Sequence, residues 1–249
     1  MVSTPDMIED LLILDYLVQE GGGPSFLDGK VLTGCMQRGG VAGVTGEIDD
    51  RFGSYTAESI ERFNLDGGKM MFRFVPEDER TLWTIDYCAK AITELNARGL
   101  VPFVEPLRMD FVDGKWVSKN TAGELVKLVG VIGGLGDSAH RTWLKLPYCE
   151  DYRRVAMATT LPILMLGGAS KGTPLPIYND FAAGMAARSN VRGALVGRNI
   201  TYPGPEDPAA VAAAVHAIVH AGATPEEAVE ITLQQRNRQI DYLREAVRV

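Results

Sequence analysis

The sequence predicts an α/β fold, a (β/α)8 TIM barrel that forms one domain over residues 1–249. Apolar, strand-like runs alternate with amphipathic helical stretches, which predicts parallel strands joined by crossover helices. Charged residues lie on one face of three successive runs, and a barrel interior is where such side chains meet. An open doubly wound sheet is the alternative, but helices cover both of its faces and leave these charges hard to solvate. The sequence therefore favours the barrel.

Six strands are expected from the apolar runs. They are Val31–Met36, Lys69–Val75, Leu100–Glu105, Thr142–Leu146, Leu161–Leu166 and Gly193–Val196. The chain opens with Val2–Asp6, which has the pattern of the tail of a strand and its loop, and a helical stretch, Met7–Leu17, follows at once. We therefore expect a barrel that lacks its first strand and most of its second.

Helices are expected between the strands. Glu79–Arg98 has apolar residues at helical spacing, and weaker candidates are Gly123–Ile132, Glu150–Thr159 and Asn179–Arg188. Pro208–Ala221 ends at Gly222, a residue type typical of helix C-caps. Thr224 is expected to cap the last helix, with Pro225 at its first position.

Composition bounds the class of protein. The formal net charge is -7 and the pI is about 5.1, which argues against nucleic acid or an anionic membrane as the partner. The sequence contains no apolar run near the roughly 20 residues that span a bilayer. Three cysteines without disulfide or metal spacing favour a reducing compartment. We therefore expect a cytoplasmic protein with a small-molecule substrate.

No cofactor or metal is expected. The sequence contains neither a Rossmann fingerprint nor a Walker loop. His216 and His220 are four residues apart in an Ala-rich helix, but no third ligand accompanies them. The acidic stretch Glu47–Arg51 is read as a solvated loop rather than a metal site.

Lys145 is the leading catalytic candidate. It interrupts the hydrophobic strand Trp143–Pro147, and a buried ammonium is costly unless an amine of lowered pKa is useful as a nucleophile. Pro147 ends the strand, so Lys145 lies near the carboxyl end, where barrel enzymes carry their active sites. The alternative is a lysine whose amine reaches solvent while its stem packs.

Lys69 and Glu105 lie on two other strands and are the further catalytic candidates. Two nearby ammonium groups lower each other's pKa, and a carboxylate beside them can accept a proton. The structural alternatives are a rim lysine for Lys69 and an ion pair for Glu105. The combination of the three residues favours a site.

Two strands end in glycines, which lets backbone N–H groups approach an anion. Gly167 and Gly168 follow one strand, and Gly197 and Arg198 follow the next. Barrels often bind phosphate after strands seven and eight, and an Arg fork matches a phosphate. We therefore expect these four residues to bind a phosphate, although glycines also serve in ordinary tight turns.

Two other arginines are candidate substrate-binding residues. Arg38 follows the first convincing strand, and Arg73 shares the strand face of Lys69. Arg38 can equally be a solvated loop residue, and Arg73 can equally pair with a carboxylate.

These residues resemble class I, Schiff-base aldolases of the deoxyribose-phosphate and tagatose-bisphosphate aldolase type. Leu144–Pro147 looks like the sixth strand with its Schiff-base lysine, and Phe103–Leu107 looks like the fifth-strand glutamate motif. Asp66–Lys69 looks like the fourth-strand lysine motif, while Leu166–Gly168 and Val196–Asn199 look like the phosphate strands. The resemblance covers roughly residues 30–220. The sequence shows no counterpart of the acidic residue that the family carries on its first strand.

The resemblance implies a lyase that cleaves a phosphorylated keto sugar to a three-carbon ketone phosphate and an aldehyde, in carbohydrate catabolism. Lys145 would form the Schiff base, Glu105 would transfer protons and Lys69 would lower the pKa of Lys145. A sugar-phosphate isomerase without a covalent step is one alternative. A non-catalytic barrel that binds a phosphorylated metabolite is another, favoured by the missing first strand.

The number of expected strands leads to a prediction about how the chain assembles. A barrel with too few strands leaves unpaired edges. We therefore expect that the chain forms a homo-oligomer or that residues 1–30 cover the gap, with Ala228–Val249 as a second candidate cover or contact.

Overall fold

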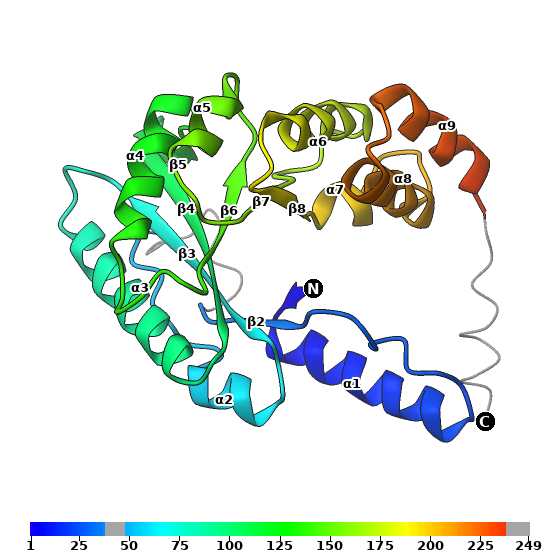
Figure 1. The fold of residues 1–249 in the computed structure, drawn as a ribbon, viewed down its shortest axis with the longest axis horizontal. Helices are drawn as coiled ribbons and strands as arrows, with labels where there is room; N and C mark the ends of the chain where they lie inside the picture. Colours follow the sequence, from blue (N-terminus) through cyan, green and yellow to red (C-terminus); the bar gives the residue numbers. More distant parts are fainter. Residues whose placement is uncertain (38–47, 238–249) are drawn as a thin grey trace.

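The structure, a computed structural model, describes residues 1–37 and 48–237. Within these ranges, parallel strands form one curved sheet in the order β1-β2-β3-β4-β6-β7-β8 (Figure 1). The strands are β1 (Val2–Ser3), β2 (Thr33–Cys35), β3 (Gly67–Phe74), β4 (Val101–Val112), β6 (Trp143–Pro147), β7 (Ile163–Leu166) and β8 (Val191–Leu195), and β5 (Lys115–Ser118) pairs with β4 in antiparallel fashion.

Helices cover the convex face of this sheet (Figure 1). They are α1 (Pro5–Glu20), α2 (Ala57–Arg62), α3 (Arg80–Ala97), α4 (Ala122–Gly133), α5 (Tyr152–Met157), α6 (Leu175–Ala187), α7 (Arg198–Thr201), α8 (Pro208–Ala221) and α9 (Pro225–Gln235). The core lies between the sheet and the helices, and Leu144 and Leu146 of β6 are fully buried there. Because strand side chains alternate, the residue between them faces the concave side.

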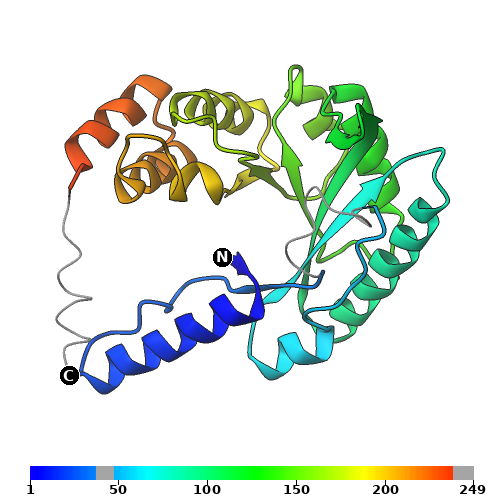
Figure 2. The same cartoon turned by 180° about the vertical axis from the view of Figure 1, so that it is seen from behind.

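The architecture is a parallel α/β half-barrel. All six expected strands are present, and Val2–Ser3 is also a strand, as the opening of the sequence predicts. In the described part of the chain β1 and β8 are not paired with each other, and Figures 1 and 2 show the gap between them. The α/β class with parallel strands is confirmed. A (β/α)8 barrel that lacks its first strand and most of its second stays a prediction.

The strand that carries Glu105 is longer than expected. The predicted run ends at Glu105, but β4 continues through Pro106 to Val112 and turns back into β5. Proline lacks an N–H donor, yet Pro106 still pairs in register with Phe72 of β3. Asp113 and Gly114 both have positive φ, 49° and 77°, which matches the twist of a two-residue hairpin turn.

Helix ends follow their capping residues. Gly222, with φ 69°, ends α8 as expected, and Thr224 begins α9 in a capping box with Glu227. Helix α2 was not expected, although Thr56 caps it by accepting a hydrogen bond from the Ser59 N–H. Helix α6 begins four residues before the predicted Asn179, because Pro174 and Pro176 suit a helix start.

The N-terminal segment does not cover the gap. Residues 1–30 form β1, α1 and the following loop, and these make one side of the gap instead (Figure 1). The sequence-based expectation of a cover by this segment is therefore wrong, because β1 pairs with β2 and fixes α1 beside it. Of the other candidate, Ala228–Val249, residues 238–249 lie outside the described part. No helix among the described residues is long and apolar enough to cross a membrane.

We predict that the 249-residue chain self-associates, because the facing edges of β1 and β8 expose N–H and C=O groups that favour pairing with another chain. Light scattering on the purified chain should give a mass above the 27.0 kDa of one copy. A mass of one copy that persists on concentration would contradict the prediction.

Candidate active site

Lys145 lies on the concave face of the sheet, as its strand pattern predicts. Its neighbours Leu144 and Leu146 point into the helix-facing core and are completely buried. The side chain of Lys145 is 19% exposed, so its amine is accessible from the concave side. Two residues later Pro147 ends β6, which places Lys145 at the carboxyl end of the parallel strands.

Three strands bring the three candidate catalytic residues together. Lys69 on β3 and Lys145 on β6 both donate to the same oxygen, Oε2 of Glu105 on β4, at 2.6 Å and 3.0 Å. The strands β3, β4 and β6 are adjacent, and their registers place Phe103 opposite both Lys69 and Trp143. One carboxylate therefore lies between two ammonium groups.

Burial and the neighbouring charges shift the pKa values of Glu105 and Lys145 in opposite directions. Burial alone raises the pKa of Glu105, but Lys69 and Lys145 outweigh burial and lower this pKa to about 2. For Lys145, burial lowers the pKa of the amine, Glu105 opposes the change and the charge of Lys69 adds to it. The net effect lowers the pKa of Lys145, in the direction that the sequence analysis predicts, and favours a neutral, nucleophilic amine.

Gln37 fixes the backbone of β3 beside Lys69. Its side-chain amide donates to the Met71 carbonyl and accepts from the Met71 N–H, both at 2.5 Å. The backbone of Gln37 forms an antiparallel bridge with Phe52. The Gln37 side chain makes the two hydrogen bonds to β3 that the backbone of a neighbouring strand would otherwise make. Sequence reasoning missed Gln37, since nothing local to it signals a partner 34 residues away.

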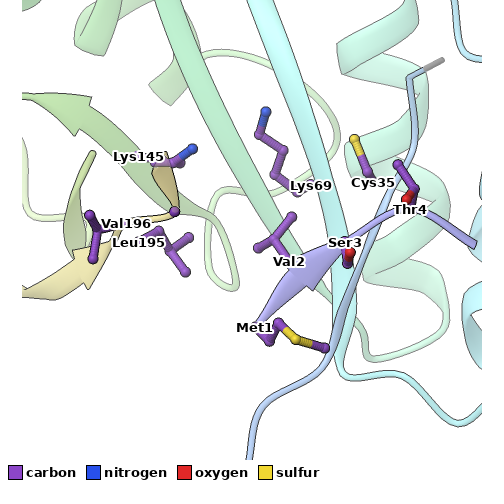
Figure 3. Close-up of a pocket in the computed structure, with 10 residues that line it drawn as sticks. Met1, Val2, Ser3, Thr4, Cys35, Lys69, Lys145, Leu195 and Val196 are labelled. Atoms are coloured by element: carbon purple, nitrogen blue, oxygen red, sulfur yellow. The ribbon is translucent and has the colours of Figure 1, made fainter. Parts of the chain in front are cut away.

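Both lysines line a cavity of about 500 Å³ (Figure 3). In Figure 3 the Lys145 amine points toward Lys69. The lining residues are Met1, Val2, Ser3, Thr4, Cys35, Lys69, Lys145, Leu195, Val196 and Gly197. Cys35, which pairs in register with Lys69, is a cavity residue that sequence reasoning did not single out for the site.

The two glycine loops face different cavities. Gly197 lines the cavity of the two lysines, whereas Gly167 and Gly168 line a neighbouring cavity of about 260 Å³. Asn199 joins the loops, because its Nδ2 donates to the Gly167 carbonyl at 2.7 Å. Arg198 is exposed and lines neither cavity. Phosphate binding by these loops stays a prediction.

Of the two further arginines predicted to bind substrate, the structure describes Arg73. Arg73 is buried and forms an ion pair with the buried carboxylate of Asp50, which is the structural alternative named for it. Substrate binding by Arg73 stays a prediction. Arg38 lies outside the described residues.

Among residues 1–37 and 48–237, no group of three or more His, Cys, Asp or Glu side chains is arranged to hold a metal ion. The rings of His216 and His220 lie on the exposed side of α8, with centroids 4.5 Å apart and planes tilted by 40°.

Comparison with known proteins identifies one family and several structural relatives. The Cgl0159-like family model matches residues 1–219. The crystal structure of Cgl0159 from Corynebacterium glutamicum (Brevibacterium flavum) is 32% identical, with a TM-score of 0.80 over 89% of this chain and 71% of that chain. The sequence matches no curated protein.

Two archaeal structures have the same fold at low identity. An archaeal fructose 1,6-bisphosphate aldolase has a TM-score of 0.62 at 17% identity, over 88% of this chain and 86% of that chain. An archaeal fructose-1,6-bisphosphate aldolase whose catalytic Lys is covalently bound to a carbinolamine intermediate has a TM-score of 0.54 at 17% identity, over 79% and 78%. The α/β fold is thus similar to that of aldolase barrels, and the tagatose-bisphosphate subtype suggested by the sequence is not confirmed.

We predict opposite pH shifts for two variants. Lys69→Met removes a neighbouring positive charge, so the pKa of Lys145 rises and amine attack needs a higher pH. Glu105→Gln removes the group that raises this pKa, so attack begins at a lower pH. The pH dependence of borohydride-trapped adduct measures both, with Lys127→Met as a control on an exposed α4 lysine. Identical profiles for the wild type and Lys69→Met would remove Lys69 from this role.

We also predict that Glu105 contributes pH-dependent stability. Its pKa falls from an ordinary 4.5 to about 2 on folding, so its contribution is present above pH 4.5 and is lost as the pH falls toward 2. This shift corresponds to about 3 kcal/mol of unfolding free energy at neutral pH. Denaturant unfolding should show a large deficit for Glu105→Gln at pH 7 that shrinks toward pH 3. A deficit independent of pH, or one equally large for the exposed Glu150→Gln, would refute this assignment.

Proposed function

We propose that this chain, which belongs to the Cgl0159-like family, is a class I aldolase that cleaves a phosphorylated keto sugar through a Schiff base on Lys145. The observation that carries the proposal is an accessible lysine of lowered pKa at the carboxyl end of a parallel strand, within 3.0 Å of a buried carboxylate. An amine in this setting suits attack on a ketone. The aldolase fold of the archaeal structures supports the same reaction class.

The proposed reaction begins with the amine of Lys145. Neutral Lys145 adds through Nζ to the ketone carbon, and loss of water from the carbinolamine gives an iminium. The iminium accepts the electron pair of the C3–C4 bond as a base removes the C4 hydroxyl proton, which releases the aldehyde and leaves an enamine. Protonation and hydrolysis of the enamine return the amine and a three-carbon ketone phosphate such as dihydroxyacetone phosphate.

Glu105 is the proposed proton-transfer group. It shares its oxygen with two ammonium groups in the resting site, and this keeps it ionised. When Lys145 is a neutral amine, or part of the neutral carbinolamine or enamine, one of the two positive charges that lower the pKa of Glu105 is lost, and the carboxylate becomes a better proton acceptor. Lys69 is 5% exposed in its side chain, so we assign it an electrostatic role rather than covalent attack.

The charge balance of the cavity favours an anionic substrate. With both lysines protonated, two ammonium groups face one carboxylate, and one positive charge is left over. Gly197 lines this cavity, and we propose that its N–H, with Arg198 and the loop at Gly167 and Gly168, holds the phosphate. Arg38 and Arg73 are further proposed contacts to the substrate.

We predict that borohydride reduction in the presence of dihydroxyacetone phosphate or a keto-sugar phosphate adds one substrate-derived group to Lys145. Peptide mass spectrometry locates the adduct. Lys145→Arg should abolish both adduct and cleavage, because an arginine does not form the iminium, while Lys127→Arg on the surface should leave both unchanged.

Other outcomes identify the alternatives. An adduct on a different lysine, or cleavage without any adduct, would contradict the Schiff-base mechanism. Turnover that survives Lys145→Arg would favour a sugar-phosphate isomerase. Tight binding of a sugar phosphate without turnover would favour a non-catalytic binding protein.

A further inference from the structure

Besides the two lysines, Cys35 is the titratable side chain that lines the Lys145 cavity in the described part of the chain. It lies on β2 and pairs in register with Lys69 of β3. On the other face of β2, a Cβ added at Gly34 would lie 2.6 Å from the Tyr55 ring, so that face packs against the core. Because strand side chains alternate, Cys35 points to the concave side, where the substrate of the proposed reaction would bind.

The three cysteines of the chain differ in accessibility. Cys88 and Cys149 are buried, at 0% and 7% exposure, and burial raises the pKa of each thiol. A thiol that is buried in apolar surroundings is inert. Cys35 is half-buried, and its sulfur donates one weak hydrogen bond, 3.7 Å long, to the Gln37 carbonyl. Cys35 is therefore the cysteine whose position suits chemistry in the cavity.

The carboxylate of Glu105 is less well placed to contact a substrate. Glu105 is 8% exposed and is not among the residues that line the cavity. Its pKa of about 2 in the resting site also means that it has no proton to donate near neutral pH. Loss of water from a carbinolamine needs a proton donor beside the departing hydroxyl group, and a cavity-lining thiol can supply that proton.

Charge couples Cys35 to the reacting nitrogen of Lys145. Burial lowers the pKa of Lys145, and a negative charge on Cys35 is one of the influences that oppose this change. An iminium carries its positive charge at the same nitrogen, so the same attraction stabilises an iminium that faces a thiolate. The position of Cys35 therefore favours a state in which its proton has been given to the substrate.

We propose that Cys35 is a further catalytic residue of this site, the proton carrier that contacts the oxygen atoms of the substrate. The inference rests on the proposed function, because it assigns a role in the reaction at Lys145. Glu105 exchanges protons with the two lysine amines, and Cys35 exchanges them with the substrate.

The thiol acts twice in one cycle. It first donates its proton to the hydroxyl group of the neutral carbinolamine, which leaves as water, and the products are the iminium cation and the Cys35 thiolate. The thiolate then accepts the C4 hydroxyl proton as the C3–C4 bond breaks and its electron pair moves toward the iminium. This second step gives the aldehyde and the neutral enamine, and it restores the thiol.

The test compares Cys35→Ser and Cys35→Ala with Cys149→Ala, a matched change at a buried cysteine outside the cavity. The assay is borohydride trapping of dihydroxyacetone phosphate on Lys145. Serine keeps the size of the side chain but is a far weaker acid than cysteine. Since positioned proton transfer contributes on the order of 10²–10⁴-fold to a rate, both Cys35 variants should lower the maximal trapping rate about 100-fold and change the half-saturating concentration less than about threefold. Cys149→Ala should leave both values unchanged.

A second measurement uses the unaltered chain. Iodoacetamide should alkylate Cys35 in the free protein, and the reduced dihydroxyacetone phosphate adduct on Lys145 should prevent this alkylation if the thiol contacts the bound molecule. Peptide mass spectrometry reports both modifications.

Four outcomes would overturn the inference. The first is an unchanged trapping rate in both Cys35 variants, and the second is a higher half-saturating concentration at an unchanged maximal rate, which would make Cys35 a binding residue. The third is an equal loss in Cys149→Ala, and the fourth is alkylation of Cys35 that the adduct does not slow. All four leave the proposed function intact. A wild type that forms no Lys145 adduct would reject the proposed function and this inference with it.

Discussion

One buried carboxylate holds the candidate site together. Glu105 on β4 accepts hydrogen bonds from lysines on both neighbouring strands through the same oxygen. Without it, two ammonium groups would face each other in the interior, and removing one partner of a buried ion pair typically costs about 3–5 kcal/mol. The same contact links three adjacent strands side by side. Stability and chemistry at this site therefore depend on one interaction.

The two lysines differ in ways that matter for chemistry. The Lys69 side chain is 5% exposed and that of Lys145 is 19% exposed, although both bind the same oxygen. Lys145 is the more accessible of the two, and the charge of Lys69 contributes to lowering its pKa.

Sequence periodicity predicted the strands and the common face of Lys69, Glu105 and Lys145, because each strand places alternate side chains on one face. It did not predict the length of β4, since Pro106 is an ordinary strand breaker and its continued pairing depends on β3. The sequence allowed Arg73 to pair with a carboxylate but did not identify Asp50 as the partner, and it missed the Gln37 contact with Met71. Their partners lie 23 and 34 residues apart, and only the folded chain brings them together. Asn199 belongs to the predicted phosphate motif Val196–Asn199, but nothing in the local sequence predicts its hydrogen bond to the Gly167 carbonyl.

A direct titration of the Lys145 amine tests the central claim most closely. Nitrogen-15 NMR of the lysine Nζ groups, assigned by comparison with Lys145→Arg, reports the protonation of each amine in the resting protein. The account predicts that the Lys145 resonance titrates below the ordinary lysine pKa of 10.5, because burial and Lys69 outweigh Glu105. A Lys145 resonance that titrates at or above 10.5 would contradict the account.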